Sequence, residues 1–315
     1  MLIVIALGGN ALLQRGEPLE ADLQKKNVKL TAQAIAKLIH EGHQVVVCHG
    51  NGPQVGLLAL QNDAYKKVKS YPLDVLDAES QGMIGYLIQQ ELGNCIAPHP
   101  TVTLLNQVVV DKNDPAFKAP AKPIGPVYHT KEEAETVAKE RGWQIAPDGK
   151  YFRRVVPSPQ PQKIIELPTI KALLQLKTTV ICGGGGGIPV TQSAEGKLEG
   201  AEAVIDKDNT TSLIARELNA DMMVILTDVP AVCVHWGTPE EQSIKAASPE
   251  ALSKLDFAKG SMGPKISASI KFASKTGKPA AIGRLADVDE IIKGKSGTRI
   301  DNNVDGIAYY PKLPG

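Results

Sequence analysis

The sequence has little of what marks several common protein classes. Only four of its 315 residues are cysteines, and these form no CxxC pair. Its 35 basic and 34 acidic residues nearly cancel to a formal charge of +1, so no overall field attracts nucleic acid or an anionic membrane. We therefore expect neither as a partner, and any anionic ligand must be held by local charge.

The apolar runs are short. Met1 to Leu7 is far shorter than a membrane span, and it lacks the basic region and the cleavage site of a signal peptide. We expect it to be the first strand of a cytoplasmic protein. In that compartment cysteines are expected as buried free thiols, in preference to disulfides or metal ligands. The four are Cys48, Cys95, Cys182 and Cys233.

The familiar nucleotide and zinc signatures are also missing. The glycine run near the middle of the chain is no GxGxxG, because Ile188 or Pro189 falls where its last glycine must be. Asp289 occupies the first glycine position of a P-loop that would end at Gly294-Lys295-Ser296. The histidines of His40 to His43 are three residues apart, where a zinc helix needs four.

What the chain does have is an alternation of strand-like and helix-like patterns. This alternation predicts an α/β protein with a mostly parallel sheet covered by helices on both faces. We expect strands at 2–7, 44–48, 101–110, 178–182, 222–226 and 279–282, and helices at about 28–39, from 54, 79–92, 209–218 and 264–275.

One stretch interrupts this alternation. Residues 112–161 contain many prolines and one short helical pattern, at 131–141. A structureless insert of this length is improbable in a compact domain, so we expect a small subdomain or lid. The prolines are Pro115, Pro120, Pro123, Pro126, Pro147, Pro157, Pro159 and Pro161.

Glycine-rich loops follow several of the expected strands. Five consecutive glycines, 183–187, come after the β-branched run 178–181, and their bare amides favour a phosphate cradle over a flexible turn. The carboxyl ends of parallel strands gather ligands at one sheet edge. Three glycine-rich loops there predict a site for several phosphate oxygens. The candidate loops are 8–12, 49–54, 183–187 and 227–230.

Two lysines are well placed to supply positive charge. Lys207 lies between Asp206 and Asp208 just before an expected helix, and Lys265 opens another. A lysine at a helix N-terminus, held by a carboxylate, can neutralise transferring phosphoryl oxygens. Either lysine by itself would be interpreted as a solvated surface charge. Their setting within glycine-rich loops reverses that preference. No Ser/His/Asp nucleophile arrangement is evident, and His49 is interpreted as a packed loop residue.

Taken in order, these loops closely resemble those of carbamate kinases in the amino-acid kinase family. The resemblance spans almost the whole chain. Segments 122–126 and 153–159 are specific to the carbamate branch, whereas the glycine-rich loops occur in related kinases too. The matching segments are 6–12, 49–56, 79–86, 122–126, 153–159, 184–190, 204–208, 227–229 and 260–265.

The resemblance implies a fold, a reaction and a set of site residues. The fold is an open αβα sandwich around a mainly parallel sheet with a small protruding subdomain. Residues 1–175 would form the N-terminal carbamate lobe, including the lid at about 112–161, and residues 176–315 the C-terminal nucleotide lobe. The reaction is reversible phosphoryl transfer from carbamoyl phosphate to ADP, giving ATP and carbamate, with Mg²⁺ carried on the nucleotide phosphates and no metal ligands from the protein.

The same resemblance assigns individual roles. Lys207 and Lys265 would stabilise the transferring phosphoryl group, Asp208 would orient them, and Lys122 would reach in from the lid. The carbamate and phosphate side would be lined by Gly8, Gly9, Asn10, Gly50, Asn51 and Gly52. The nucleotide side would include Gly183, Gly184, Asp228, Met262 and Gly263 together with Lys207 and Lys265.

Two positions depart from the family pattern. Ser267 stands where an acidic residue is common, and a tyrosine is often found near Cys233. The alternatives are another amino-acid kinase, acting on a carboxylate or a nucleoside monophosphate, or a nucleotide-binding regulatory paralogue without turnover. The resemblance and the apolar segment 82–92 also predict a homodimer, with core burial as the rival explanation of that segment. Arginine breakdown is one pathway that such an enzyme serves, and the sequence leaves the pathway open.

Overall fold

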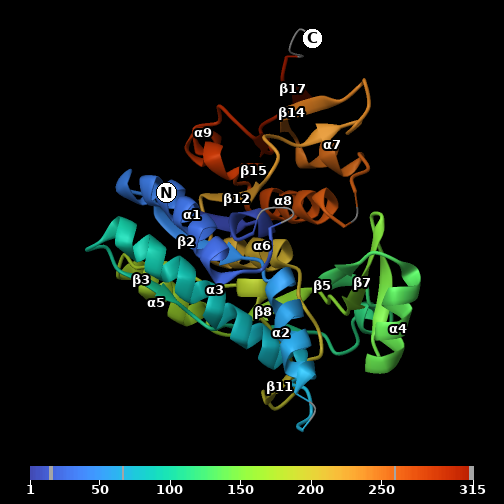
Figure 1. The fold of residues 1–315 in the computed structure, drawn as a ribbon. Helices are drawn as coiled ribbons and strands as arrows, with labels where there is room; N and C mark the ends of the chain where they lie inside the picture. The colour runs from blue at the N-terminus through green and yellow to red at the C-terminus, as the bar shows by residue number, and fades with distance from the viewer. Residues whose placement is uncertain (14–16, 66, 259, 312–315) are drawn as a thin grey trace.

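The computed structural model describes residues 1–13, 17–65, 67–258 and 260–311. A layered body carries a small green unit projecting on the right of Figure 1. The helices are α1 (Ala21–His40), α2 (Gly52–Ala64), α3 (Leu73–Ile96), α4 (Lys131–Arg141), α5 (Leu167–Gln175), α6 (Lys207–Glu217), α7 (Pro249–Ser253), α8 (Met262–Thr276) and α9 (Val288–Ile292), with 3-10 turns η1 (Gly9–Ala11), η2 (Pro115–Phe117), η3 (Gly184–Gly186) and η4 (Leu285–Asp287). The strands are β1 (Leu2–Leu7), β2 (Gln44–His49), β3 (Thr101–Thr103), β4 (Gln107–Val110), β5 (Lys122–Tyr128), β6 (Gln144–Asp148), β7 (Tyr151–Val156), β8 (Pro161–Ile164), β9 (Thr179–Ile181), β10 (Ile188–Gln192), β11 (Leu198–Gly200), β12 (Met222–Thr227), β13 (Cys233–Val234), β14 (Gln242–Ala247), β15 (Ala280–Arg284), β16 (Thr298–Ile300) and β17 (Ile307–Tyr309).

One large sheet forms the centre of the molecule. Within the described residues it has ten strands in the order β13-β14-β16-β15-β12-β1-β2-β9-β3, with β17 paired to β14. Each pairing from β15 through β12, β1, β2 and β9 to β3 is parallel, and antiparallel pairs occur toward the other edge. The predicted α/β class with a mainly parallel sheet is confirmed.

Strand β1 shows why helices cover both faces of this sheet. Because successive side chains of a strand point to opposite faces, Val4 and Ala6 join one apolar cluster, and Ile3 and Ile5 join another. The first cluster includes residues of α5, α6 and α8, and the second includes residues of α1, α3 and α9. All four β1 side chains are fully buried. The result is the expected αβα sandwich.

The single strand expected at 101–110 is wrong. Residues Thr101–Thr103 pair with β9 in the central sheet, whereas Gln107–Val110 belong to a second sheet, β11-β10-β4-β8. The chain changes sheets at Asn106, whose backbone N–H donates to Oε1 of Gln81 and whose carbonyl accepts from Ile188. An apolar run does not reveal such a change of partner.

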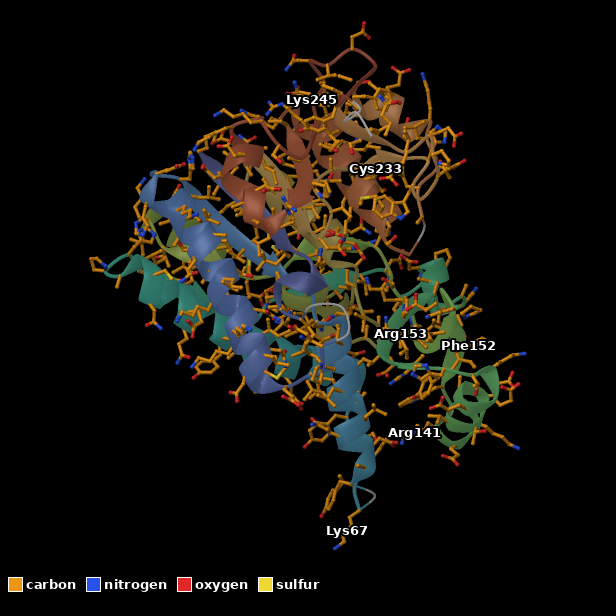
Figure 2. All side chains as sticks on the ribbon, turned by 45° about the horizontal axis from the view of Figure 1, so that its top comes forward. Lys67, Arg141, Phe152, Arg153, Cys233 and Lys245 are labelled. Carbon is orange, nitrogen blue, oxygen red and sulfur yellow. The ribbon has the colours of Figure 1, made fainter. Side chains whose placement is uncertain are left out.

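The proline-rich stretch contains a separate small unit, which we call the lid subdomain (residues 122–156). Its sheet has the order β5-β7-β6, and the helix expected at 131–141 is confirmed as α4. Thr130 caps this helix by accepting a hydrogen bond from the backbone of Glu133. The lid subdomain spans fewer residues than the predicted insert, 112–161, because Phe117 packs on the core of the body and Pro161 begins β8. Figure 2 places Arg141, Phe152 and Arg153 on this subdomain.

The two predicted lobes share the central sheet. Strand β9 follows the expected boundary at residues 175 and 176, yet it lies between β2 and β3, which precede that boundary. In the described part of the chain, no helix is long and apolar enough to cross a membrane. All four cysteines are free, as predicted; Cys48 and Cys182 are buried, and Cys95 and Cys233 are half-buried. Figure 2 shows Cys233 and Lys245 in the C-terminal part.

Candidate active site

The loops selected from the sequence gather at one edge of the central sheet. Strands β12, β1, β2 and β9 are consecutive parallel neighbours, so the loops after them leave from the same edge. This arrangement was predicted from the sequence and is confirmed. The edge therefore brings together residues 8–12, 49–54, 183–187 and 227–230.

The five glycines form a tight buried turn. Gly183, Gly185, Gly186 and Gly187 have φ between +65° and +95°, a region that favours glycine. A Cβ on Gly185 would lie 2.1 Å from Nδ2 of Asn51, and one on Gly186 would lie 2.2 Å from a carbonyl oxygen of Ile205. The run is therefore glycine because neighbouring backbone and side chains pack directly against it.

The amides of this turn are largely committed within the protein. Gly183 donates to Oδ1 of Asn106 at 2.7 Å, and the next bonds run from Gly186 and Gly187 back to the carbonyls of Gly183 and Gly184. The turn leads into strand β10. The expectation of an open cradle of several free amides is thus corrected, because three of the five amides already have partners.

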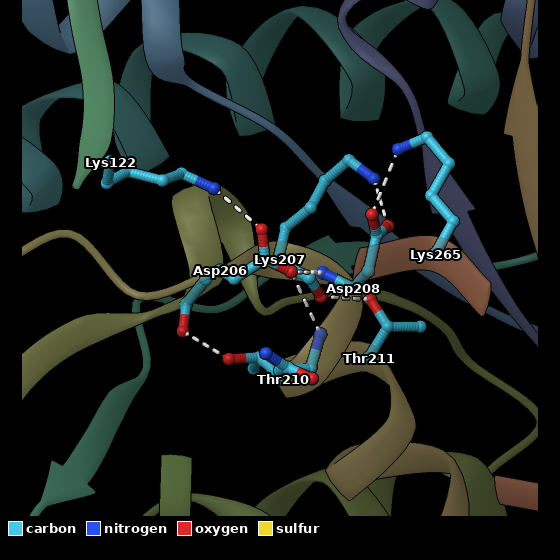
Figure 3. A network of polar contacts seen from close by, with 9 residues as sticks. Lys122, Asp206, Lys207, Asp208, Thr210, Thr211 and Lys265 are labelled. Atoms are coloured by element: carbon cyan, nitrogen blue, oxygen red, sulfur yellow. Dashed lines mark hydrogen bonds and ion pairs between the residues drawn. The ribbon is translucent and has the colours of Figure 1, made fainter. Parts of the chain in front are cut away.

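The start of α6 carries the central charged group. Asp206 is its N-cap, and Oδ1 of this residue accepts from the backbone N–H of Asp208 at 3.0 Å and of Asn209 at 3.3 Å. Lys207 is the first residue of the helix, and its ammonium pairs with the Asp208 carboxylate. Lys265, in the first turn of α8, pairs with the other oxygen of Asp208 at 2.9 Å. Figure 3 shows Asp208 between the two lysines.

The lid subdomain supplies the fourth predicted catalytic residue. Lys122 opens β5, and its Nζ lies 2.6 Å from Oδ2 of Asp206. Figure 3 shows this lysine reaching across to the N-cap of α6. The four side chains assigned to catalysis by sequence, which are Lys122, Lys207, Asp208 and Lys265, are thus brought into one network that also contains Asp206.

Burial and mutual attraction set the protonation of this group. Burial alone would raise the pKa of Asp208, which is 3% exposed, but the charges of Lys207 and Lys265 outweigh it and hold that pKa far below its usual range. Burial lowers the pKa of Lys207, and the Asp208 charge opposes this effect. Burial acts the same way on Lys265, but Asp208 and its hydrogen bond raise the pKa above the ordinary value. Asp208 is therefore an anion that anchors two ammonium groups.

Of the residues expected on the carbamate and phosphate side, Gly50 lies against this network. Gly50 faces Lys207, since a Cβ there would lie 3.4 Å from Cδ of the lysine. Gly8 donates to the carbonyl of Leu226 at 2.9 Å, Gly9 begins η1 and Gly52 begins α2. The side chain of Asn10 lies outside what the structure describes.

Asn51 is held from behind by α3. Its Nδ2 donates to Oδ1 of Asp77 at 2.7 Å and to Oγ of Ser80 at 2.8 Å, which uses both amide hydrogens. Asp77 is fully buried, and burial raises the pKa of its carboxyl well above the usual value. The amide donors of Asn51 therefore position the loop, and its backbone carbonyl accepts from Val55 at the start of α2.

A cavity of about 590 Å³ opens beside Lys265. Its size suits a small-molecule ligand. Three residues predicted for the nucleotide side, Asp228, Met262 and Lys265, line it, whereas Gly183 and Gly184 are buried away from its lining. The other lining residues are Thr227, Val229, Ala231, Cys233, Val234, His235, Trp236, Leu255, Asp256, Phe257, Ala258, Ser261 and Tyr309. Gly263 adjoins this cavity through Met262, and its amide donates to Ala258 at 2.9 Å.

Sequence reasoning missed the residues that support the site. Asp206 was noted only as a neighbour of Lys207, although an aspartate directly before a helix signals an N-cap. Ser80 and Gln81 lie in segment 79–86, one of those that resemble carbamate kinases. Nothing in the sequence showed that Ser80 holds Asn51 or that Gln81 holds the carbonyl of Gly184. Within the described residues, no group of three His, Cys, Asp or Glu side chains could hold a metal ion.

Lysines clustered where parallel strands end, beside a cavity of nucleotide size, define a phosphotransferase. The chain belongs to the amino acid kinase family, whose family model matches residues 1–284. It is 58% identical over 311 residues to the carbamate kinase of Haemophilus influenzae, covering 98% of this chain and 100% of that one. The carbamate kinase of Escherichia coli is 50% identical, with 95% and 98% covered. The resemblance to carbamate kinases noted in the sequence is confirmed.

Solved structures agree with this assignment. A carbamate kinase from Giardia lamblia bound to AMP-PNP matches with a TM-score of 0.87 and 41% identity, covering 95% of this chain and 98% of that one. A UMP kinase from Bacillus anthracis, 14% identical with a TM-score of 0.57, shares the fold alone.

Proposed function

We propose that the protein is a carbamate kinase, which transfers a phosphoryl group reversibly between carbamoyl phosphate and ADP. The observation that carries the proposal is the network in which Asp208 holds Lys207 and Lys265 while the lid subdomain presents Lys122. Identity of 58% to a carbamate kinase over nearly the full chain supports it.

The transfer requires charge neutralisation more than proton movement. A terminal oxygen of ADP forms a bond to phosphorus, the bond from phosphorus to the carbamoyl oxygen breaks, and carbamate leaves with that electron pair. Both oxygens are anionic, so no general base is needed. Lys207 and Lys265 offset the negative charge on the transferring group, and Asp208 fixes their positions. Lys122 adds a third positive charge from the lid side.

The cavity beside Lys265 is the proposed nucleotide site. Its lining combines apolar side chains with two carboxylates, Asp228 and Asp256. A Mg²⁺ ion that arrives on nucleotide phosphates needs only one or two protein carboxylates, so this lining fits it. In place of the expectation that the protein supplies no metal ligand, Asp228, whose charge acts on Lys265, would hold the ion. When bound, the ion would neutralise phosphate oxygens.

The glycine loops form the proposed carbamoyl phosphate side. Gly50 already lies against Lys207, and Gly8 and Gly9 begin the neighbouring loop. A small planar carbamate needs a tight anionic pocket. Because carbamoyl phosphate is a mixed anhydride with high transfer potential, net synthesis of ATP is the expected physiological direction. Free thiols fit a reducing cytoplasm.

We include a homodimer in the proposal. Helix α3 exposes Met83 at 37% and Tyr86 at 59%, and Tyr86 lines a groove against β3. β3 is the edge strand of the central sheet. Sedimentation of the wild-type protein and of Tyr86→Glu tests this face, with the variant expected to shift toward monomer.

A panel of substrates tests the activity. The purified protein is given ADP and carbamoyl phosphate with Mg²⁺, and ATP is followed by a coupled readout. In parallel it is given ATP with acetylglutamate, aspartate, glutamate or UMP, and ADP release is followed. We expect ATP from carbamoyl phosphate and little release with the others. Turnover only with another acceptor would move the assignment to a sister kinase, and silence on every pair despite nucleotide binding would favour a regulatory protein.

A further inference from the structure

Asp206 occupies a position between two parts of the molecule that are distant in sequence. Oδ2 of its carboxylate accepts a hydrogen bond from Lys122 in the lid subdomain, 84 residues away. Oδ1 accepts from the backbone of Asp208 and Asn209 in the first turn of α6. One carboxylate therefore joins the lid to the helix that carries Lys207 and Asp208 (Figure 3).

Asp206 also interacts electrostatically with the lysines of the site. Burial lowers the pKa of Lys207 and the negative charge of Asp206 opposes that lowering, while the same charge adds to the raised pKa of Lys265. With Lys122, three cationic side chains therefore interact with Asp206. The contact with Lys122 is half-buried, with 27% of the lysine side chain and 17% of the aspartate side chain exposed. A charged hydrogen bond in such surroundings is stronger than a surface ion pair.

We propose that Asp206 is a positioning residue that couples the lid subdomain to α6. It holds Lys122 over the site and, through the same carboxylate, fixes the helix turn from which Lys207 and Asp208 project. Asp206 then affects phosphoryl transfer through Lys122, and its capping bonds fix the position of the first turn of α6. This inference rests on the proposed function, since it assigns Lys122 a place in that reaction.

Asparagine at this position separates the two tasks. Asp206→Asn keeps an oxygen that caps α6 as well as aspartate does, but it removes the charge that binds Lys122. Lys122→Met removes the other partner, and the double variant completes a cycle. Asp287→Asn is the matched control, because Asp287 pairs with Arg284 at 25% exposure outside the lid.

The first readout is kcat/KM for ATP formation. We expect Asp206→Asn to lower it on the order of tenfold, by the size of a lost hydrogen bond between charged groups. In the Lys122→Met background the same substitution should cost less than about twofold, because its partner is already gone. Asp287→Asn should match wild type. Equal losses in both backgrounds, or no loss on the wild-type background, would overturn the coupling.

The second readout does not depend on activity. Limited proteolysis should cleave the lid subdomain faster in Asp206→Asn and in Lys122→Met than in wild type. The double variant should be cleaved no faster than either single variant. Wild-type rates in both single variants would contradict the inference. If the wild-type protein made no ATP while these cleavage rates rose, the proposed function would fail and the coupling would stand. Should Asp206→Asn not fold, Asp206→Ser repeats the test, since serine caps a helix but is too short to reach Lys122.

Discussion

His49 shows how tightly single residues are fixed behind the site. It ends β2 and is buried, with its Nδ1 lying 3.0 Å from the carbonyl oxygen of Gly50. A Cβ on Gly184 would come within 2.5 Å of Nε2, so the ring fills the space beside the glycine turn. Burial lowers the pKa of His49 to about 4. The ring is therefore neutral at pH 7, and it packs as the sequence predicted.

This shift predicts a pH dependence of stability. The unfolded histidine titrates near its ordinary pKa, so between that value and about 4 the unfolded state binds a proton that the folded state does not. The free energy of unfolding therefore falls as pH drops through this window. Between pH 7 and pH 5 we expect the stability difference between wild type and His49→Gln to shrink by roughly 2 kcal/mol.

Urea unfolding at the two pH values measures this difference. His40→Gln, which removes an exposed histidine outside the site, is measured in parallel as a comparison. A difference for His49→Gln that is independent of pH would show that the buried ring is not the source.

At the scale of elements, the glycine turn and the helix ends use glycine for different reasons. Gly186 has a φ of +95°, and a Cβ there would collide with the backbone of Ile205. Gly277 ends α8 with a φ of +71° and has open space around it. Gly186 is therefore constrained by its backbone conformation and by steric contact with Ile205, whereas Gly277 is constrained by its backbone conformation alone.

Alanine at the two positions should therefore have unequal effects. Gly277→Ala should cost about 1 kcal/mol, the price of a left-handed conformation for an ordinary residue. Gly186→Ala should cost a further 1 to 3 kcal/mol, roughly, because the backbone around it must move. Denaturant unfolding compares them directly, and equal costs would contradict the packing argument.

The lid subdomain is the element that we expect to move. Besides the Lys122 contact, it meets the body where Gly125 approaches Gly56 of α2 and where Ile124 and Val156 pack against residues of α2 and α3. Two ion pairs, Arg141 with Asp63 and Arg154 with Glu202, join the same parts. We predict that ADP with a carbamoyl phosphate analogue closes it further, because lids that exclude water are common in phosphoryl transfer. Proteolysis should cut within 112–161 first, and ligands should slow that cleavage. Identical cleavage with and without ligands would count against a closing lid.

Which elements the sequence could predict follows from how each is encoded. Buried parallel strands are continuous apolar runs, so β1, β2, β9 and β12 and their loops were predictable. The break at Asn106 was not, because it depends on Gln81 and on the glycine turn meeting there. The partner of Lys122 was also unpredictable, since the two residues of that pair come together only in the folded chain.

At the scale of the whole molecule, one continuous sheet carries the loops of both proposed substrate sides. The loops of the first half follow β1 and β2, and the cavity of the second half lies beside β12, their neighbour. Lys207 of α6 lies against Gly50 of the first half, and Asp208 of the same helix pairs with Lys265, which lines the cavity. Assigning carbamate to residues 1–175 and nucleotide to 176–315 stays a prediction, and the shared sheet is consistent with direct transfer between them.

The central claim is that the lysines held by Asp208 carry out this transfer. Initial rates of ATP formation from ADP, Mg²⁺ and carbamoyl phosphate should be measured for wild type, for Lys207→Met and for the exposed control Lys254→Met. We predict a loss of about 100- to 1000-fold in Lys207→Met, with folding and ADP binding retained, because its charge acts mainly where phosphoryl charge develops. Lys254→Met should match wild type. Wild-type turnover in Lys207→Met, with an unchanged melting temperature, would contradict the account.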